Sequence, residues 1–178
     1  MSAAARAAGS LELARRIQAS IRADACRSRD VERIGPFIAT FTPDDPNPFL
    51  NYAIPEQDAR PAPADVDALV AAYRTRGRTP RLEYVPALAP AVEAALLAAG
   101  FGAESRLPLM VAGSVRELAV DGIELVEAAS DDDYRAVAAV QWEAYEEQGE
   151  APQRVADGLR RSSDAGGVVL LARDTRTG

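Results

Sequence analysis

The stretch RTPRLEYVPALAPAVEAALLAAGF (residues 78–101) decides the fold, because it combines a strand pattern, a turn and a helix with a marked end. RLEYV (81–85) is typical of a short strand, and a proline follows it. A helix is predicted over about residues 88–99, and Leu88, Val92 and Leu96 form one apolar stripe along it. Gly100 closes this helix, and Phe101 comes directly after it. The stretch therefore predicts a strand–turn–helix unit with a defined end.

The segments before this stretch predict a helix, a β-hairpin and a second helix. Residues 10–29 place their leucine and isoleucine side chains mainly on one face, opposite arginines, as in an amphipathic helix. Residues 31–43 are apolar and β-branched, and they are interpreted as one strand that bends or begins at Gly35-Pro36. A turn leads to a second strand over 49–55, so these two strands are expected to form a hairpin. A helix follows from about 63 to 76.

The sequence beyond this stretch predicts one more strand and then a second unit. That strand covers 106–112, and a boundary falls near 113–122. The second unit has the order strand, helix, helix, strand, at about residues 123–128, 130–147, 152–161 and 168–172. Its first helix opens with SDDD, where a Ser precedes an acid by three residues, as in a capping box. We therefore predict two domains, 1–117 and 122–178.

The composition excludes several kinds of chemistry. The 178-residue chain has no histidine and one cysteine, Cys26, which excludes Ser–His and Cys–His nucleophiles and zinc sites built from Cys and His. All 20 basic residues are arginines, which excludes a Schiff-base lysine and a P-loop. The net charge of −7 argues against nucleic acid as a partner. No metal site is expected.

The sequence also predicts where the protein works. No apolar run approaches the roughly 20 residues that span a bilayer, so no membrane association is expected. Arginines interrupt the Ala-rich N-terminus, which argues against a signal peptide. A single cysteine fits a reducing compartment. A soluble cytoplasmic protein is the expectation.

The order of elements in residues 31–112, together with AAGF at 98–101, resembles the later part of the GNAT (GCN5-related N-acetyltransferase) fold. Residues 123–178 are similar to the opening of that fold. The resemblance implies an α/β (α+β) fold with a mixed, mostly antiparallel central sheet flanked by helices. It also implies an N-acyltransferase that moves an acetyl group from acetyl-CoA, as co-substrate, to the amine of a small molecule or peptide.

The first unit departs from the family at the positions that carry chemistry. The family's glycine-containing pyrophosphate loop would fall on PEQDARPAP (55–63), which has no glycine and three prolines. Proline lacks the N–H donor that binds phosphate at a helix N-terminus. A Tyr and an Asn of the family's last helix fall on Leu96 and Ala89, and Leu96 is expected in the core. The first unit is therefore interpreted as a degenerate GNAT-like domain that lacks the CoA loop.

The second unit begins like the family, but the sequence stops before the strands and loop that would bind acyl-CoA. It is interpreted as the beginning of a second GNAT-like domain, in a chain that is part of a longer protein. The alternative is that the 178 residues form one compact unit that has lost the chemistry.

The resemblance places candidate substrate-binding residues in QWEAYEEQGE (141–150), because the family's first two helices help form the acceptor pocket. The candidates are Trp142, Tyr145 and Glu146. Carboxylates there would attract an amine and take its proton through water. The simpler interpretation is that Trp142 and Tyr145 are core aromatics and that the glutamates form a solvated face.

Two hypotheses of function follow. In the first, the complete protein is an acetyl-CoA-dependent N-acyltransferase, and this chain alone is inactive. In the second, the chain is a non-catalytic module for packing, dimerisation or small-ligand binding. Neither hypothesis assigns a catalytic or CoA-binding residue. An unpaired edge strand after Ala172 would favour pairing with another chain, as in a homo-oligomer.

Overall fold

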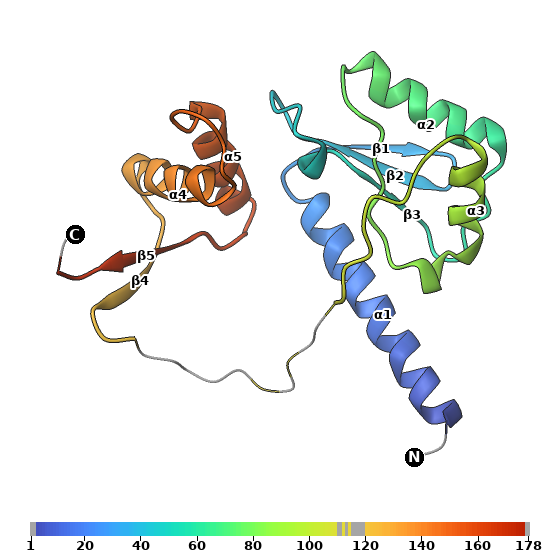
Figure 1. Ribbon diagram of the computed structural model, residues 1–178, viewed down its shortest axis with the longest axis horizontal. Helices are drawn as coiled ribbons and strands as arrows, with labels where there is room; N and C mark the ends of the chain where they lie inside the picture. The colour runs from blue at the N-terminus through green and yellow to red at the C-terminus, as the bar shows by residue number, and fades with distance from the viewer. Residues whose placement is uncertain (1–2, 110–111, 113, 115–119, 177–178) are drawn as a thin grey trace. The chain divides into compact units, whose positions relative to one another are not determined.

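The structure is a computed structural model that describes residues 3–109, 112, 114 and 120–176 (Figure 1). The chain divides into two compact units, Met1–Glu104 and Ser105–Gly178. The boundary predicted at 113–122 falls largely outside the described residues. No helix within the described part of the chain is long and apolar enough to cross a membrane.

The first unit opens with helix α1, Ala3–Ala25. The helix begins earlier than the predicted residue 10, because the alanines that precede it are the best helix formers. It also ends earlier than the predicted residue 29. The N–H of Cys26 donates to the Arg22 carbonyl at 3.0 Å, and the chain then turns into the first strand.

Residues 30–41 form two strands. The prediction of a strand that bends at Gly35-Pro36 was wrong, whereas the alternative, a strand that begins at this dipeptide, agrees with β2. Strand β1, Asp30–Ile34, pairs antiparallel with strand β2, Phe37–Phe41. Gly35 and Pro36 form the two-residue turn between them. Gly35 has a φ of +51°, and a positive φ at the first turn position is what a type II′ hairpin needs. The apolar pattern continues on both sides of the turn, so the sequence did not predict a separate strand before it.

Strand β3, Ala53–Pro55, pairs antiparallel with β2 and completes a sheet of order β1-β2-β3. The expected hairpin between these segments is thus present. The predicted strand 49–55 is shorter than expected, because a 3₁₀ turn, η1 (Pro48–Leu50), takes its first residues. Buried Asn51 holds this connection: its side chain donates to the carbonyls of Asp45 and Asn47 and accepts from the Thr42 N–H.

Helix α2, Pro63–Thr75, leads to a segment that makes a single parallel bridge, Ala53 to Leu82, beside β3. The predicted strand 81–85 is therefore reduced to this bridge. The next parallel hydrogen bond would need an N–H at Pro55, and proline has none. The N–H of Val85 is instead taken by the Gln18 side chain of α1, at 2.8 Å.

Helix α3, Pro90–Ala98, follows a 3₁₀ turn, η2 (Pro86–Leu88), and confirms the predicted helix and its end. Gly100 has a φ of +87° and donates to the Leu97 carbonyl, while the Phe101 N–H reaches the Leu96 carbonyl at 3.0 Å. These two bonds are those of a Schellman motif. Phe101 packs against the same core as Leu96, which explains why Gly-Phe ends this helix.

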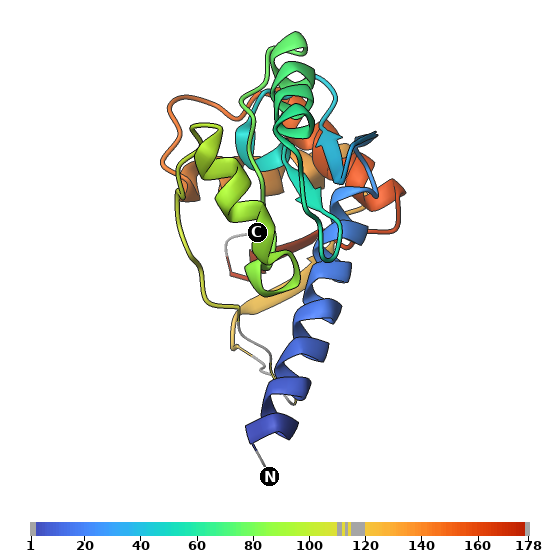
Figure 2. The ribbon, with the colours of Figure 1, turned by 90° about the vertical axis from the view of Figure 1, so that its right-hand side faces the viewer.

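The sheet of the first unit lies between helices (Figures 1 and 2). One face packs against α2 and α3. The main core cluster there includes Phe37, Phe41, Val66, Leu69, Tyr73, Val92 and Leu96. The other face carries Tyr52 and Ile54, which pack against Ala25 of α1.

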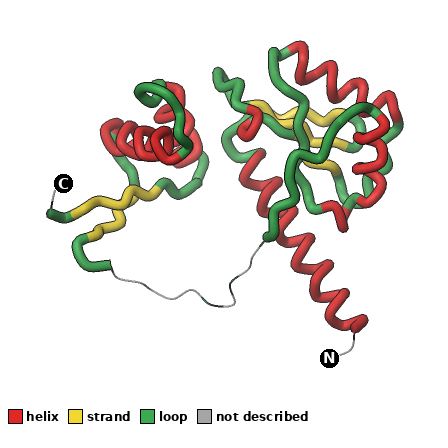
Figure 3. Tube along the Cα trace, in the orientation of Figure 1, coloured by secondary structure: helices red, strands yellow, loops and turns green. Residues whose placement is uncertain are grey.

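The second unit is a two-stranded antiparallel sheet with two helices (Figure 3). Its elements are β4 (Ile123–Glu127), α4 (Asp131–Ala144), α5 (Gln153–Asp164) and β5 (Leu170–Asp174). The register pairs Val126 with Leu171 on the face that joins the core of the helices. Leu125 and Leu170, on the opposite face, are 66% and 54% exposed.

The predicted α/β class with antiparallel strands is confirmed, and the described strands form one small sheet in each unit. Strand β5 begins two residues after the predicted position 168. The predicted strand at 106–112 is not formed over 106–109, and residues 110 and 111 lie outside the described part.

Candidate functional site

The N-terminus of α2 is where the GNAT resemblance places the phosphates of CoA, and here a side chain of the helix itself occupies it. The Asp65 carboxylate accepts the backbone N–H of Ala62 at 2.8 Å. The first helical residue is Pro63, which has no N–H to offer. A carboxylate and a phosphate compete for the same helix end, because both are stabilised by its free N–H groups and partial positive charge.

The loop before α2 uses its N–H groups within the protein. Glu56 donates to the Pro36 carbonyl at 2.9 Å, Asp58 to Leu88 at 2.7 Å and Ala59 to Glu56 at 3.2 Å. The Glu56 carboxylate, which forms an ion pair with Arg33 at 2.5 Å, adds negative charge to the loop. At these positions the loop has neither the donors nor the charge that a pyrophosphate needs.

The two positions that carry chemistry in the family's last helix are core positions in this chain. Leu96 is 7% exposed and Ala89 is 2% exposed, and both belong to the main core cluster of the first unit. The expectation that Leu96 is a core residue is confirmed. No side chain at either position can donate or accept a proton.

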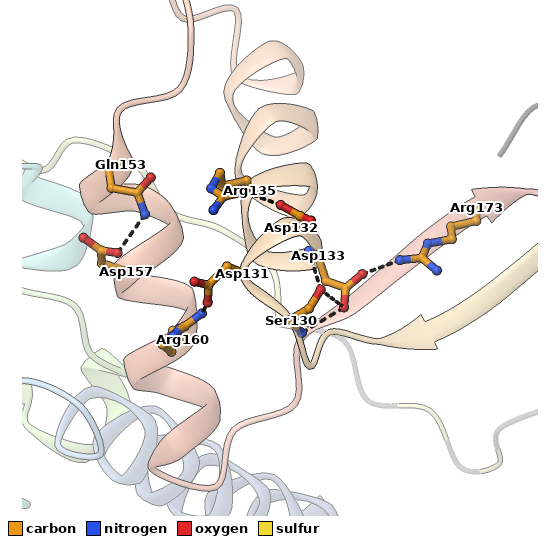
Figure 4. Close-up of polar contacts among 9 residues, drawn as sticks. All are labelled: Ser130, Asp131, Asp132, Asp133, Arg135, Gln153, Asp157, Arg160 and Arg173. Atoms are coloured by element: carbon orange, nitrogen blue, oxygen red, sulfur yellow. Dashed lines mark hydrogen bonds and ion pairs between the residues drawn. The ribbon is translucent and has the colours of Figure 1, made fainter.

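Helix α4 of the second unit begins with a complete capping box, as SDDD predicted (Figure 4). The Ser130 hydroxyl donates to the Asp133 carboxylate at 2.7 Å and accepts the Asp133 N–H at 3.2 Å. The hydrogen bond from the Ser130 side chain, followed by those from the Ser130 and Ala129 N–H groups, lowers the pKa of Asp133 to about 2. Arg173 of β5 also pairs with this carboxylate and acts in the same direction.

The other two aspartates of this motif have arginine partners as well. Asp132 pairs with Arg135 one turn along α4, and Asp131 pairs with Arg160 of α5 (Figure 4). Asp131 and Asp133 thus tie the start of α4 to α5 and β5, whereas Asp132 pairs within α4. We assign this cluster to the fold of the unit, because every carboxylate in it has a cationic partner.

A groove of about 560 Å³ lies between α4, the loop that follows it and the start of α5. Its walls include Arg135, Trp142, Glu143, Glu147, Glu150 and Gln153. The indole N–H of Trp142 donates to the Gln148 carbonyl at 3.2 Å, which fixes the ring beside the loop. The groove combines an aromatic surface with three carboxylates.

The three sequence-predicted substrate residues do not all lie in this groove. Trp142 lines it, whereas Tyr145 and Glu146 are not among the residues around it. Tyr145 is 79% exposed, so it is not a core aromatic. A helix that continued to Glu147 would carry these three side chains on one stripe, but α4 ends at Ala144.

The turn after α4 explains this difference and brings Glu147 and Glu150 of the predicted segment 141–150 to the groove. Glu147 donates its N–H to the Trp142 carbonyl at 3.1 Å, and Glu146 donates to Glu143 at 2.9 Å, as in a Schellman motif. Glu146 takes the left-handed position of this motif with a φ of +57°. The reversal directs the chain back along the helix, so Glu147 and Glu150 reach the groove.

The described residues contain no group of three or more His, Cys, Asp or Glu side chains that could hold a metal ion. Cys26 is free and half-buried in the first unit. Neither observation adds a second candidate site.

Comparison with known proteins supports the fold. No protein-family model matches the chain, and no curated protein matches its sequence. A solved structure, described as a GCN5-related N-acetyltransferase from Kribbella flavida, is similar over 91% of this chain, with a TM-score of 0.63 and 20% sequence identity. The chain spans 63% of the length of that protein. At this identity the similarity shows the fold, so the chain has a GNAT-like fold.

Proposed function

We propose that the chain belongs to an N-acyltransferase that moves an acetyl group from acetyl-CoA to an amine, and that the chain alone does not bind CoA. Residues 1–117 would be a degenerate GNAT-like domain, and residues 122–178 the beginning of a second one. The fold similarity supports the class of enzyme. The chain's 63% share of the similar protein's length is in keeping with a missing CoA-binding portion.

The observation that carries the second part of the proposal, that this chain alone does not bind CoA, is the hydrogen bond from Ala62 to Asp65 at the N-terminus of α2. It fills the anion-binding end of this helix with an internal carboxylate, in the unit whose last helix has also lost its polar residues. Catalysis in the complete protein would therefore use the second domain.

The proposed reaction suits a chain without His or Lys. The lone pair of a neutral amine attacks the thioester carbonyl carbon, and the tetrahedral intermediate expels the CoA thiolate as the amide forms. Backbone N–H groups stabilise the oxyanion in such a reaction, so no nucleophilic side chain is needed. The proton that the amine loses passes through water to a carboxylate, and the thiolate takes up a proton from solvent.

The acceptor amine, a small molecule or peptide, is proposed to bind at the segment that carries Trp142, Tyr145 and Glu146. Trp142 supports this most directly, because its ring forms part of a groove. A cytoplasmic location remains part of the proposal. So does pairing of two chains through an unpaired edge of the β4–β5 sheet, in which Leu125 and Leu170 are exposed.

A second candidate function is a non-catalytic packing, dimerisation or small-ligand-binding module. Burial of Leu96 and Ala89 in the core favours this for the first unit. The two candidates make different predictions for the DNA that follows the codon of Gly178.

The test has two parts. Thermal unfolding of this chain with a large excess of acetyl-CoA is expected to show no shift, whereas a ligand at 100 times its Kd would stabilise by about 2.7 kcal/mol. The coding sequence after Gly178 is expected to continue with a strand and a Gln/Arg-x-x-Gly-x-Gly loop, and the longer protein is expected to be stabilised by acetyl-CoA. A stop codon at that point, or a clear shift with this chain alone, would overturn the proposal.

A further inference from the structure

The groove between α4 and α5 has the size and construction of a small-molecule site. Its volume of about 560 Å³ falls within the range of roughly 300–1,000 Å³ typical of ligand pockets. Ala138 and Ala156, which face it from the two helices, are 1% and 4% exposed. These short side chains keep the helices close and leave room between their longer neighbours.

The charge of the groove selects the kind of ligand. Glu143, Glu147 and Glu150 make no ion pair with any described residue. The groove's cationic side chain, Arg135, is paired with Asp132 outside it. Three carboxylates against one guanidinium leave a net charge of −2 in the lining. The C-terminal end of α4 and the N-terminal end of α5 both border the groove, and their partial charges have opposite signs, so the carboxylates determine the net charge of the lining.

The aromatic wall favours an organic cation over a bare ion. Trp is the side chain whose ring face attracts ammonium groups most strongly. The hydrogen bond to Gln148 holds the indole in place before a ligand arrives, so little ordering is needed on binding. A flexible chain of methylenes between two ammonium groups would contact the ring and the alanines, and its charges would match the carboxylates.

From this we infer that the groove binds a small organic dication of the alkyl-diamine class, held by Trp142, Glu147 and Glu150. That this ligand is also the acceptor of an acyl group rests on the proposed function; its binding does not. Glu147 and Glu150 recognise the ligand, whereas Tyr145 and Glu146 lie outside the groove.

Trp142 is the only tryptophan of the chain, so its fluorescence reports on this groove alone. We would titrate the protein with 1,4-diaminobutane, with butylamine and with sodium chloride at matched ionic strength, and record heats of binding by calorimetry in parallel. Saturable binding of the diamine, about threefold tighter than that of the monoamine, is the expected result, because the second charge adds one exposed ion pair. No saturable heat, or the same affinity for both amines, would overturn the inference.

Substitutions inside and outside the groove test whether the diamine binds there. Glu147→Gln combined with Glu150→Gln is expected to weaken diamine binding about tenfold, because two partly exposed ion pairs are lost. Glu124→Gln combined with Glu127→Gln on β4 removes the same charge outside the groove and is the matched control. Equal weakening by both pairs would show a general charge effect and contradict the assignment.

The outcome is separable from that of the proposed function. Binding of the diamine without acetylation by the longer protein would sink the acyltransferase proposal and leave the site intact. The opposite outcome is acetylation by the longer protein that is not slowed, at low amine concentration, by Glu147→Gln combined with Glu150→Gln. That result would support the acyltransferase proposal and overturn the assignment of the groove.

Discussion

The Asp65 carboxylate accepts the backbone N–H of Ala62 at 2.8 Å, so helix α2 is closed at its anion-binding end by its own side chain. Asp65 also packs against Gly35 in the β1–β2 turn, where a Cβ would clash with the carboxylate. The same contact therefore stabilises the helix, fits it to the hairpin and occupies a position at which a GNAT enzyme would bind phosphate. In this unit the start of α2 makes a packing contact with the hairpin.

Replacement of Asp65 tests the structural part of this statement. Asp65→Ala is expected to lower the free energy of unfolding by about 0.5–2 kcal/mol, the usual cost of a lost helix N-cap interaction. Urea denaturation followed by circular dichroism measures it. Asp67→Ala, at an exposed acid two residues further along α2, is the control and is expected to change stability by less than about 0.5 kcal/mol. Equal effects of the two substitutions would show that the contact with Ala62 contributes nothing.

The same variant tests whether Asp65 alone prevents acetyl-CoA from binding or whether the loop before α2 also prevents it. Asp65→Ala is expected not to restore binding of acetyl-CoA, because the N–H groups of Glu56 and Asp58 stay engaged and Pro63 has none. Isothermal titration of the variant with acetyl-CoA measures this. Binding in the micromolar range would show that Asp65 was the sole obstacle.

The end of α4 predicts a substitution that raises stability. Helices α2, α3 and α5 place Gly77, Gly100 and Gly166 in the left-handed position after their last turn, whereas α4 uses Glu146. A side chain with a Cβ is strained there by roughly 1–2 kcal/mol. Glu146→Gly is therefore expected to raise the free energy of unfolding by about 0.5–1 kcal/mol, since glycine's greater freedom in the unfolded chain offsets part of the gain.

The reciprocal change supplies the control. Gly100→Ala puts a Cβ at a φ of +87°, where no atom lies within 4 Å, so strain and not a clash decides the result. It is expected to destabilise by about 1 kcal/mol. Chemical denaturation of both variants checks the pair. A destabilising Glu146→Gly would mean that the Glu146 side chain makes a favourable interaction that outweighs the strain.

The sequence predicted elements whose start or end depends on local chemistry. The end of α3 followed from Gly100 and Phe101, and the start of α4 followed from Ser130 and Asp133. Elements that depend on distant partners were harder to predict. Strand 81–85 is reduced to a bridge because Pro55, far away in the sequence, lacks an N–H, and because Gln18 binds Val85.

In the candidate site, too, some features could be predicted from the local sequence and others could not. The resemblance placed a candidate site in the segment that carries Trp142, and Trp142 lines the groove. Glu150 was missed as a lining residue, since its place depends on the reversal at Glu146. Glycine normally marks such a turn, and its replacement by glutamate removed the signal that would have ended the helix at Ala144.

Asp133 predicts a loss of stability in acid. Its pKa is lowered from 3.8 to about 2 in the folded protein, first by the Ser130 hydroxyl. Because the folded pKa is the lower one, the stabilisation is present above pH 3.8 and is lost as the pH falls through about 2. Asp133→Asn is expected to flatten the decline in stability between these pH values, as measured by denaturation at a series of pH values. Ser130→Ala should move the Asp133 titration, followed by carboxyl NMR, to higher pH, and an unmoved titration would show that Ser130 is not the cause.

The buried side chain of Tyr73 predicts how the stability of the folded protein changes at high pH. It is fully buried, and its hydroxyl approaches the Thr40 backbone without forming a hydrogen bond of full geometry. Burial raises the pKa of Tyr73 above its ordinary value of 10.0. Because the folded pKa is the higher one, the folded state keeps its proton longer than the unfolded state, and stability falls as the pH rises above 10. A chain without lysine makes this decline easier to observe, because few other groups titrate in the same range.

Tyr73→Phe removes the titrating group and keeps the ring against Phe41, whose centroid lies 4.8 Å away. At pH 7 the variant is expected to match or exceed the original stability, because a buried hydroxyl without a hydrogen bond costs about 1–3 kcal/mol in desolvation. Above pH 10 it is expected to lose stability more slowly. Tyr145→Phe, at an exposed ring, is the control at pH 7 and should leave the free energy of unfolding unchanged. A Tyr73→Phe protein destabilised by more than about 1 kcal/mol at pH 7 would show that the hydroxyl makes a hydrogen bond that contributes net stability.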